Sequence, residues 1–271
     1  MSSQWIRQQA QDENTAPETL EILANSKDEL VRQYVASNPN TPVKTLERLS
    51  SAFPEAVTAN PVFELLILEN INHRWLWIAT AKSSTTPIEK LIQFADSEDK
   101  IVREALAKNK AISLDLITKL AQDKWEWVRV AIAKNENTPA EILRKMAMDD
   151  RPFVQLAAIN NPHLPSDVLD KLAHHQDEKV RLAIAQSDRT SADSLRSLAR
   201  NQHYQVQAAV AGNSNTPLDA LSWLSKATRS DVRLAFINNP RALELPRILK
   251  KMAKDKNYSI ASAARIVLGI I

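Results

Sequence analysis

Six carboxylates recur along the chain at one spacing and could act as catalytic acids or bases. Each lies two residues after a Thr-Pro pair or a close substitute: Glu89, Asp115, Glu141, Asp167, Asp193 and Asp219. A catalytic acid has no reason to recur in every segment of a chain. An acid in the first turn of a helix, in contrast, can reach free backbone N–H groups and favours the positive helix end. We therefore predict that these acids cap helices.

Other residue types that carry chemistry are scarce or badly spaced. His174, His175 and His203 have no ligand spacing tied to an acid or a cysteine, so we expect no metal site. The chain has no cysteine, which excludes disulfides, Fe–S ligation and thiol catalysis. Its two glycines are too few for phosphate loops, dinucleotide fingerprints or a nucleophile elbow. We expect a protein that is not an enzyme and binds no cofactor.

Arginines form a second regular column. Its members are Arg32, Arg103, Arg129, Arg181 and Arg233, with Gln155 and Gln207 in two of the positions. A guanidinium group can tie neighbouring segments together by hydrogen bonds, or it can contact an anion or a nucleic acid. Neighbouring arginines about 10 Å apart repel by only about 0.4 kcal/mol in water, so the column needs no ligand. We favour the structural role and leave anion contact open.

Several tryptophans stand out from the residues at equivalent positions. Trp75 and Trp127 share a position four residues before a core alanine, so partial burial is expected. Trp125 and Trp223 occupy positions that are otherwise polar, which is typical of a protein interface. Arg129, four residues after Trp125, could form a cation–π contact with it. The candidate partner-binding residues are Trp75, Trp77, Arg103, Trp125, Trp127, Arg129, Arg181 and Trp223.

A repeat, mostly of 26 residues, positions these side chains. Its mark is an asparagine, at Asn109, Asn135, Asn161, Asn213 and Asn239, and Ser83 and Ser187 fill the two gaps in the grid. Earlier marks at Asp12, Asn38 and Asn60 make two units shorter. We predict a single domain over residues 1–271. It comprises a half-repeat cap at 1–11, nine repeats at 12–238 and a distorted C-terminal cap at 239–271.

The unit over residues 135–160 shows what one repeat contains. Thr138 can cap a helix, with Pro139 at the first helical position, and the apolar spacing that follows predicts a short amphipathic helix. A second apolar set predicts a second helix. The asparagine then ends that helix, either in the left-handed conformation or by hydrogen bonding across the turn between units. Two such helices bury too little surface alone. We therefore predict an all-α fold, an α-solenoid of about nine to ten two-helix repeats.

Charge is unevenly distributed over a chain with a net charge of +3. Residues 1–100 carry 9 basic and 14 acidic side chains, and residues 101–271 carry 26 and 18. Lys82, Lys108 and Lys134 precede the repeat mark in successive units, and a solvated face is the favoured interpretation. No positively charged start followed by an apolar run appears before Asp12, so we expect no secretory signal, and there is no apolar stretch of about 18 residues. We expect a soluble, cytoplasmic monomer that does not associate with membranes.

The turn sequences resemble a known repeat family. Residues 38–42 read Asn-Pro-Asn-Thr-Pro and are followed by Leu46 and Leu49, and residues 135–139 read Asn-Glu-Asn-Thr-Pro. This pattern resembles the leucine-rich repeat variant family of α-solenoids over nearly the whole chain. The longer period here favours a second helix that is fully α-helical. One member of that family holds an Fe–S cluster with cysteines, which this chain lacks.

The units are also similar to HEAT repeats, which favour an Asp and an Arg six residues apart. Asp123 and Arg129 match this pattern, but most units lack the acid. Both resemblances imply a non-catalytic scaffold that binds another protein, and we place the binding on the concave face of repeats three to six. The alternative is a nucleic-acid-binding protein that uses the basic surface after residue 100. An enzyme related to bilin lyases or helical-repeat DNA glycosylases has only the fold class in its favour.

Overall fold

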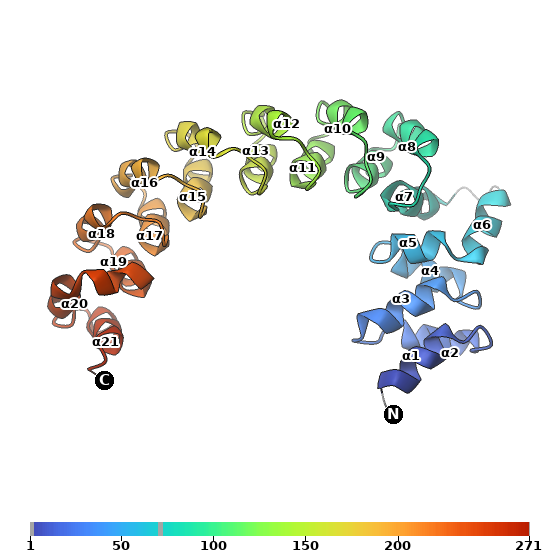
Figure 1. Ribbon diagram of the computed structural model, residues 1–271, viewed down its shortest axis with the longest axis horizontal. Coiled ribbons are helices and arrows are strands. Elements are labelled where there is room, and N and C mark those ends of the chain that lie inside the picture. The colour runs from blue at the N-terminus through green and yellow to red at the C-terminus, as the bar shows by residue number, and fades with distance from the viewer. Residues whose placement is uncertain (1–2, 70–72, 271) are drawn as a thin grey trace. The chain divides into compact units, whose positions relative to one another are not determined.

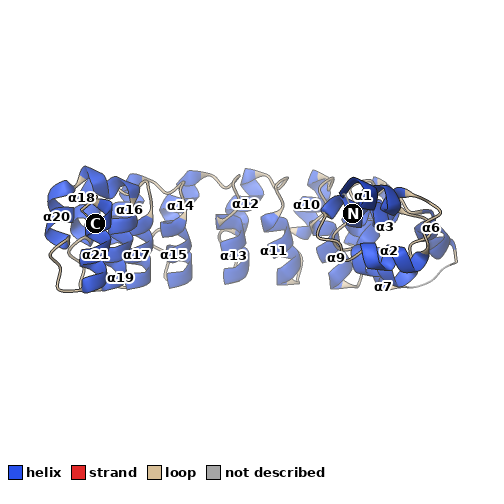
Figure 2. Cartoon of the chain, turned by 90° about the horizontal axis from the view of Figure 1, so that it is seen from below, coloured by secondary structure: helices blue, strands red, loops and turns tan. Residues whose placement is uncertain are grey.

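The regular structure of the chain is helical throughout the part described by the computed structural model, residues 3–69 and 73–270. The chain divides into two compact units, Met1–Thr138 and Pro139–Ile271. Each is built from short helices that alternate between two layers, as Figures 1 and 2 show. The predicted α-solenoid is therefore confirmed. Within the described residues, no helix is long and apolar enough to cross a membrane.

Unit 1 has a layer of first helices and a layer of second helices. The first helices are α2 (Pro17–Leu23), α4 (Val43–Leu49), α6 (Pro61–Leu68), α8 (Ile88–Ala95) and α10 (Leu114–Leu120). The second helices are α1 (Ser3–Gln11), α3 (Glu29–Ser37), α5 (Pro54–Thr58), α7 (Arg74–Lys82), α9 (Lys100–Ala107) and α11 (Glu126–Lys134). Neighbouring second helices such as α7, α9 and α11 pack together more extensively than α8 and α10 do. These repeats therefore curve toward the second helices.

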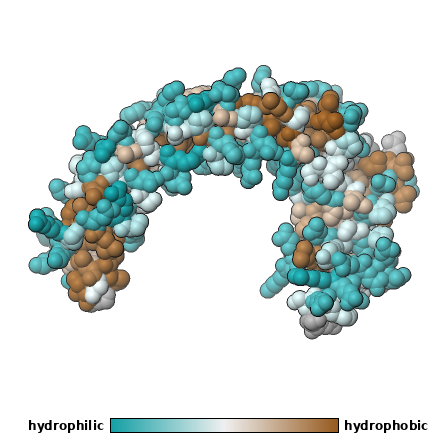
Figure 3. All heavy atoms as spheres, viewed as in Figure 1, coloured by the Kyte–Doolittle hydropathy of each residue, from teal (hydrophilic) through white to brown (hydrophobic). Residues whose placement is uncertain are grey.

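Unit 2 repeats the same arrangement. Its first helices are α12 (Ala140–Met146), α14 (Ser166–Leu172), α16 (Ala192–Ala199), α18 (Leu218–Leu224) and α20 (Pro246–Met252). Its second helices are α13 (Pro152–Ile159), α15 (Glu178–Gln186), α17 (Tyr204–Gly212), α19 (Ser230–Asn238) and α21 (Tyr258–Val267). The distorted segment after Asn239 contains a 3-10 helix, η1 (Pro240–Glu244). Apolar residues gather over the C-terminal helices of this unit (Figure 3), where Ile266 and Ile270 are exposed.

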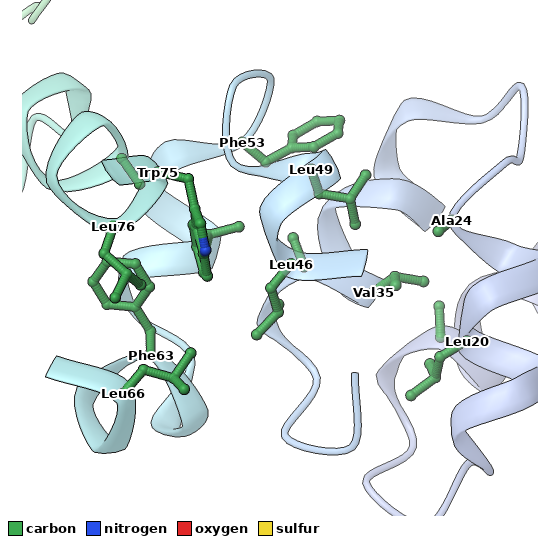
Figure 4. Packing of buried hydrophobic residues seen from close by; sticks show 14 of the residues in the cluster. Leu20, Ala24, Val35, Leu46, Leu49, Phe53, Phe63, Leu66, Trp75 and Leu76 are labelled. Atoms are coloured by element: carbon green, nitrogen blue, oxygen red, sulfur yellow. The ribbon is translucent and has the colours of Figure 1, made fainter. Parts of the chain in front are cut away.

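The core lies between the two layers and continues from repeat to repeat. Leu20, Leu46 and Leu76 are fully buried in unit 1, and Figure 4 shows that side chains from successive helices meet there. Phe63 of α6 and Trp75 of α7 make an edge-to-face contact with ring centroids 5.8 Å apart. Two short helices bury little surface, so each repeat depends on its neighbours for stability.

The repeating asparagine is a hydrogen-bonding link between repeats. Asn109 Nδ2 donates to the main-chain carbonyls of Ala81 at 2.9 Å and Ser83 at 2.7 Å, and Asn109 Oδ1 accepts from the Ala111 N–H. Equivalent pairs of carbonyl bonds are made by Asn38, Asn60, Asn135, Asn213 and Asn239. One side chain therefore makes hydrogen bonds to three backbone groups at the end of a helix and in the turns between repeats.

The left-handed conformation predicted for this asparagine is wrong. Asn135 and Asn213 have φ of −71° and −74° with ψ of 127° and 125°, which is extended backbone. The alternative interpretation, hydrogen bonding across the turn, is confirmed. The extended conformation aims the amide at the preceding repeat, where the two carbonyls accept from it.

One serine position shows how the link is replaced. Ser187 cannot span the gap, and Arg189 instead donates from Nη2 to the Ile159 carbonyl at 2.9 Å and from Nη1 to the Leu164 carbonyl at 2.6 Å. Ile159 lies 28 residues before Ser187, as Ala81 does before Asn109. The Ile159 carbonyl therefore still accepts a hydrogen bond, but the donor is Arg189, two residues after the repeat mark.

The threonine of the turn does not cap the following helix as predicted. Thr138 Oγ1 donates to the Ile132 carbonyl at 2.6 Å, so it closes the end of the preceding helix α11. Pro139 is the N-cap residue of α12, and no side-chain cap bond is present there. Thr41, Thr86, Thr190 and Thr216 make the same bond to a carbonyl six residues earlier. In each of these turns the hydroxyl therefore donates at the end of the preceding helix.

Candidate partner-binding surface

The arginine column is built into the scaffold. Arg103, Arg129 and Arg181 each donate from Nη1 to the carbonyl six residues earlier, at 2.6, 2.8 and 2.6 Å. Arg32 and Arg233 make the same bond. Gln155 and Gln207 make it with a neutral amide, at 2.7 Å in both cases. Because neutral glutamines make the same hydrogen bond to the carbonyl, this position requires a hydrogen-bond donor but not a positive charge.

Arg103 and Asp123 form a buried ion pair between successive repeats. Arg103 Nε and Nη2 donate to the two oxygens of Asp123 at 2.6 and 3.0 Å, and both side chains are less than one-tenth exposed. Burial acts to raise the pKa of the Asp123 carboxyl, but the hydrogen bonds from Arg103 and the Trp125 N–H outweigh it. The pKa of Asp123 therefore lies below its usual value.

This arrangement differs from the expected pairing of Asp123 with Arg129. Arg129 reaches the main-chain carbonyl of Asp123, and the Asp123 carboxylate belongs to Arg103 of the preceding repeat. A repeat without the acid still keeps the carbonyl bond. The scarcity of acids in the sequence therefore does not weaken the column.

A row of side-chain pairs connects the starts of neighbouring second helices. Arg74 donates to both oxygens of Asp99 at 2.6 and 2.7 Å, and Lys100 Nζ lies 3.6 Å from the centre of the Trp125 ring. In unit 2, His203 Nδ1 lies 3.0 Å from Glu178, and Arg229 stacks 4.3 Å above the Tyr204 ring. The first residue of one helix thus meets the residue before the next helix, 25 positions later.

Trp125 is a member of this row of side-chain pairs. The cation over its ring is Lys100 of the preceding repeat, whereas the sequence suggested Arg129. The two residues lie 25 positions apart, and comparing the residues at equivalent repeat positions would have paired them. Lys100 is the site residue that the sequence analysis missed.

Trp75 and Trp77 lie on α7 and pack against first helices. Trp75 is 9% exposed against Phe63. Trp77 makes an edge-to-face contact with Phe94, with ring centroids 6.0 Å apart, and Lys90 Nζ lies 5.9 Å from its centre. A hollow beside Trp77 is also lined by Arg74 and Asp99. Trp77 is therefore partly accessible, and Trp75 belongs to the core.

Trp127 and Trp223 are the most exposed of the candidate aromatic residues. Trp127, the second residue of α11, is 39% exposed, although the equivalent Trp75 is buried. Trp223 is 45% exposed on α18, where a hollow also lined by Arg196 and Arg200 adjoins it. Trp223 lies in the first-helix layer of unit 2, so it is not part of the second-helix surface of unit 1.

Two of the six recurring acids form ion pairs between first helices. Arg144 Nη1 lies 2.5 Å from Asp167, and Arg196 Nε lies 2.9 Å from Asp219, in each case 23 residues later. The hydrogen bonds from these arginines lower the pKa of Asp167 and of Asp219. The predicted capping box is wrong for Glu141, because Thr138 does not cap α12. In the described part of the chain, no group of three or more His, Cys, Asp and Glu residues could hold a metal ion.

Comparison with known proteins supports the fold. No protein-family model matches the sequence, and no curated protein matches it. A solved leucine-rich repeat variant with a repetitive structural motif is similar to this chain, with a TM-score of 0.59 and 18% sequence identity over 90% of this chain and 88% of that one. An engineered protein aligns over 98% of this chain with a TM-score of 0.38 and 15% identity, which is too weak a likeness to support an inference. The chain has the fold of a leucine-rich repeat variant, as its turn sequences predicted.

Proposed function

We propose that this chain is a non-catalytic scaffold that binds another protein through the second-helix layer, on the concave face of repeats three to six. Solenoids present long surfaces of this kind to partners. Repeats three to five lie within unit 1, and their second helices are α7, α9 and α11. The observation that carries the proposal is the exposure of Trp127 on α11, since large aromatic side chains anchor protein interfaces.

The surroundings of Trp127 suit a partner with both apolar and acidic groups. Lys100, the first residue of α9, stacks on the ring of Trp125, the residue before α11. Lys82 and Lys108 lie at the C-terminal ends of α7 and α9, whereas Trp127 lies at the start of α11. Burial, and then the charge of Lys108, lowers the pKa of Lys82. Lys108 is already paired with Glu104 at 2.6 Å, so a carboxylate of a partner would be attracted mainly by Lys82.

Nucleic-acid binding is the alternative, and the ion pairs speak against it. Many basic side chains after residue 100 already face an acid at 3.0 Å or less: Arg103, Lys108, Lys119, Arg144, Arg196 and Arg241. Neutralised cations attract phosphates weakly and release few counterions. These six cations therefore contribute less to a nucleic-acid surface than the number of basic residues suggests.

A lysate pull-down with the immobilised chain tests the proposal. The lysate is treated with nuclease, and retention is compared at low and high salt for the wild type, Trp127→Ala and Leu114→Ala. Leu114 is 59% exposed on α10, in the other layer of the same repeat, so it is the matched control. We expect one protein to be retained by the wild type and by Leu114→Ala. A loss of more than about 1 kcal/mol of binding energy in Trp127→Ala, about fivefold in affinity, is the predicted effect.

Two results would count against the proposal. Retention that disappears on nuclease treatment or falls steeply with salt would favour nucleic-acid binding. Equal retention by Trp127→Ala and the wild type would remove Trp127 from the binding surface. Circular dichroism of each variant checks that the helices are intact.

A further inference from the structure

Arg103 forms an ion pair with the Asp123 carboxylate. Arg181 on α15 occupies the equivalent position but has no carboxylate partner among the described residues. Both arginines use Nη1 for two carbonyls of the preceding loop, and for Arg181 these are His175 at 2.6 Å and Gln176 at 2.8 Å. Arg103 then gives its Nε and Nη2 edge to Asp123. The same edge of Arg181 makes no hydrogen bond within the described residues, and its Nε is buried.

The residue at the position of Asp123 in the next repeat is Asn201. Asn201 Oδ1 accepts from the His203 N–H at 3.0 Å, as Asp123 Oδ1 accepts from the Trp125 N–H. The remaining terminal group of Asn201 is therefore its NH₂, a donor, where Asp123 has its second oxygen. Arg181 and Asn201 present donors to the same place, and neither group finds an acceptor among the described residues.

Other arginines of the column have a balancing group at this place. The guanidinium of Arg32 lies 5.6 Å from the centre of the Phe53 ring, and Arg233 Nε lies 3.4 Å from Asp255. Gln155 and Gln207 carry no charge to balance. Among the described residues, Arg181 therefore differs from Arg32, Arg103 and Arg233, each of which has such a group.

A hollow of about 750 Å³ opens at this position, between the loops of repeats seven and eight in unit 2. Its lining includes Arg181 and Asn201 together with Arg200, His174 and His203. The one acid in the lining, Glu178, lies 3.0 Å from His203 Nδ1. The lining is rich in donors and can surround an anionic group.

We propose that this hollow is a carboxylate-binding site, with the ligand carboxylate taking the role that Asp123 has for Arg103. The planar guanidinium edge matches a carboxylate by two parallel hydrogen bonds. The carboxylate comes either from a free small acid or from an acidic side chain of a peptide. The site lies in repeats seven and eight. A negative result for it would therefore leave the protein-binding surface proposed for repeats three to six unaffected, and the reverse also holds.

Isothermal titration calorimetry on the full chain tests this site with four probes. They are glutarate, an acetylated and amidated Ala-Asp-Ala peptide, its Ala-Asn-Ala counterpart, and inorganic phosphate. Two variants remove the site in different ways. Asn201→Asp supplies the chain's own carboxylate, and Arg181→Gln keeps the carbonyl bond, as Gln155 and Gln207 do, but removes the guanidinium edge. Arg233→Gln, in the same column beside Asp255, is the matched control.

We expect the wild type and Arg233→Gln to bind glutarate or the aspartate peptide. Both site variants should bind at least about tenfold more weakly, and the asparagine peptide should not bind. Binding of the peptide alone would assign the carboxylate to a partner side chain, and binding of glutarate would assign it to a free acid. Without ligand, Asn201→Asp should unfold at a higher temperature than the wild type, because Arg181 gains an acceptor.

Three results would overturn the proposal. One is equal binding of the probes to the wild type, Asn201→Asp and Arg181→Gln. Another is binding of phosphate without binding of either carboxylate. The last is no heat of binding for either carboxylate up to about 10 mM, a concentration at which even a weak site with a Kd near 1 mM would be filled. Unchanged circular dichroism of the two site variants shows that they fold.

Discussion

Asn109 Nδ2 donates to the main-chain carbonyl of Ser83 over 2.7 Å, so the mark of one repeat is hydrogen-bonded to the mark of the repeat before it. The same relation joins Asn135 to Asn109 at 3.0 Å, and Asn239 to Asn213 at 2.8 Å in unit 2. Asn109 is fully buried, so its amide is shielded from water. Buried polar links of this kind fix the register of neighbouring repeats because their absence leaves carbonyls unsatisfied.

Replacing this asparagine should destabilise the fold. Asn109→Ala removes the side-chain partner of the Ala81 carbonyl and of the Ala111 N–H, and it takes one of two donors from the Ser83 carbonyl, which keeps the Thr86 N–H. The expected cost is about 1–3 kcal/mol for each buried group that is left without a partner and that water cannot reach. Urea denaturation followed by circular dichroism measures the loss. Asn137→Ala is the control, because that side chain makes an exposed bond to the Lys110 carbonyl and should cost far less. Equal losses in the two variants would contradict the role given to Asn109.

The buried ion pair gives a second prediction. Arg103→Ala leaves Asp123 buried without its cation and should cost about 3–5 kcal/mol. The double variant Arg103→Gln with Asp123→Asn removes both charges and keeps a donor for the Ser97 carbonyl, as Gln155 does for Asp149. It should recover most of the loss in urea denaturation. A double variant as unstable as Arg103→Ala would show that the charge itself is needed.

Acid should weaken unit 1 through its lowered carboxyl pKa values. Hydrogen bonds from Arg74 lower the pKa of Asp99 in the folded chain, whereas the unfolded value is about 3.9. The unfolded chain then binds more protons in acid, so this contribution is full above about pH 5 and is lost as the pH falls through the folded pKa.

Urea midpoints at pH 7, 5 and 3 check this expectation. Asp99→Asn should show a smaller fall in stability with acid than the wild type. Asp115→Asn, at an acid of α10 for which no ion pair is found among the described residues, is the control and should follow the wild type. Parallel curves for the wild type and Asp99→Asn would contradict the assignment.

The sequence predicted what is local or periodic. The grid of marks placed the helix pairs, because apolar spacing within ten residues decides where a short helix forms. It also singled out the arginine column, whose structural use was the favoured interpretation. The 3-10 helix η1 lies after Asn239, in the C-terminal cap that the sequence predicted to be distorted.

Contacts between repeats were harder to predict. Thr138 was predicted to cap the helix that follows it, yet it donates to a carbonyl at the end of the previous helix. The marking asparagine had two interpretations, a left-handed helix end and a bond across the turn, and only the second is correct. Trp125 was paired with its neighbour Arg129, but Lys100 stacks on it from 25 residues away. Side chains at that separation meet only through the stacking of repeats, which local spacing does not reveal.

The most direct test of the central claim is site-specific photo-crosslinking from the second-helix layer. A benzophenone amino acid replaces Trp127 in one variant and Leu114 in another, and each is irradiated in a nuclease-treated lysate of the source cells. We predict a discrete crosslinked protein band from position 127 that position 114 does not give. Identical crosslinks from both positions, or none from position 127 in a variant that folds, would contradict binding through this layer.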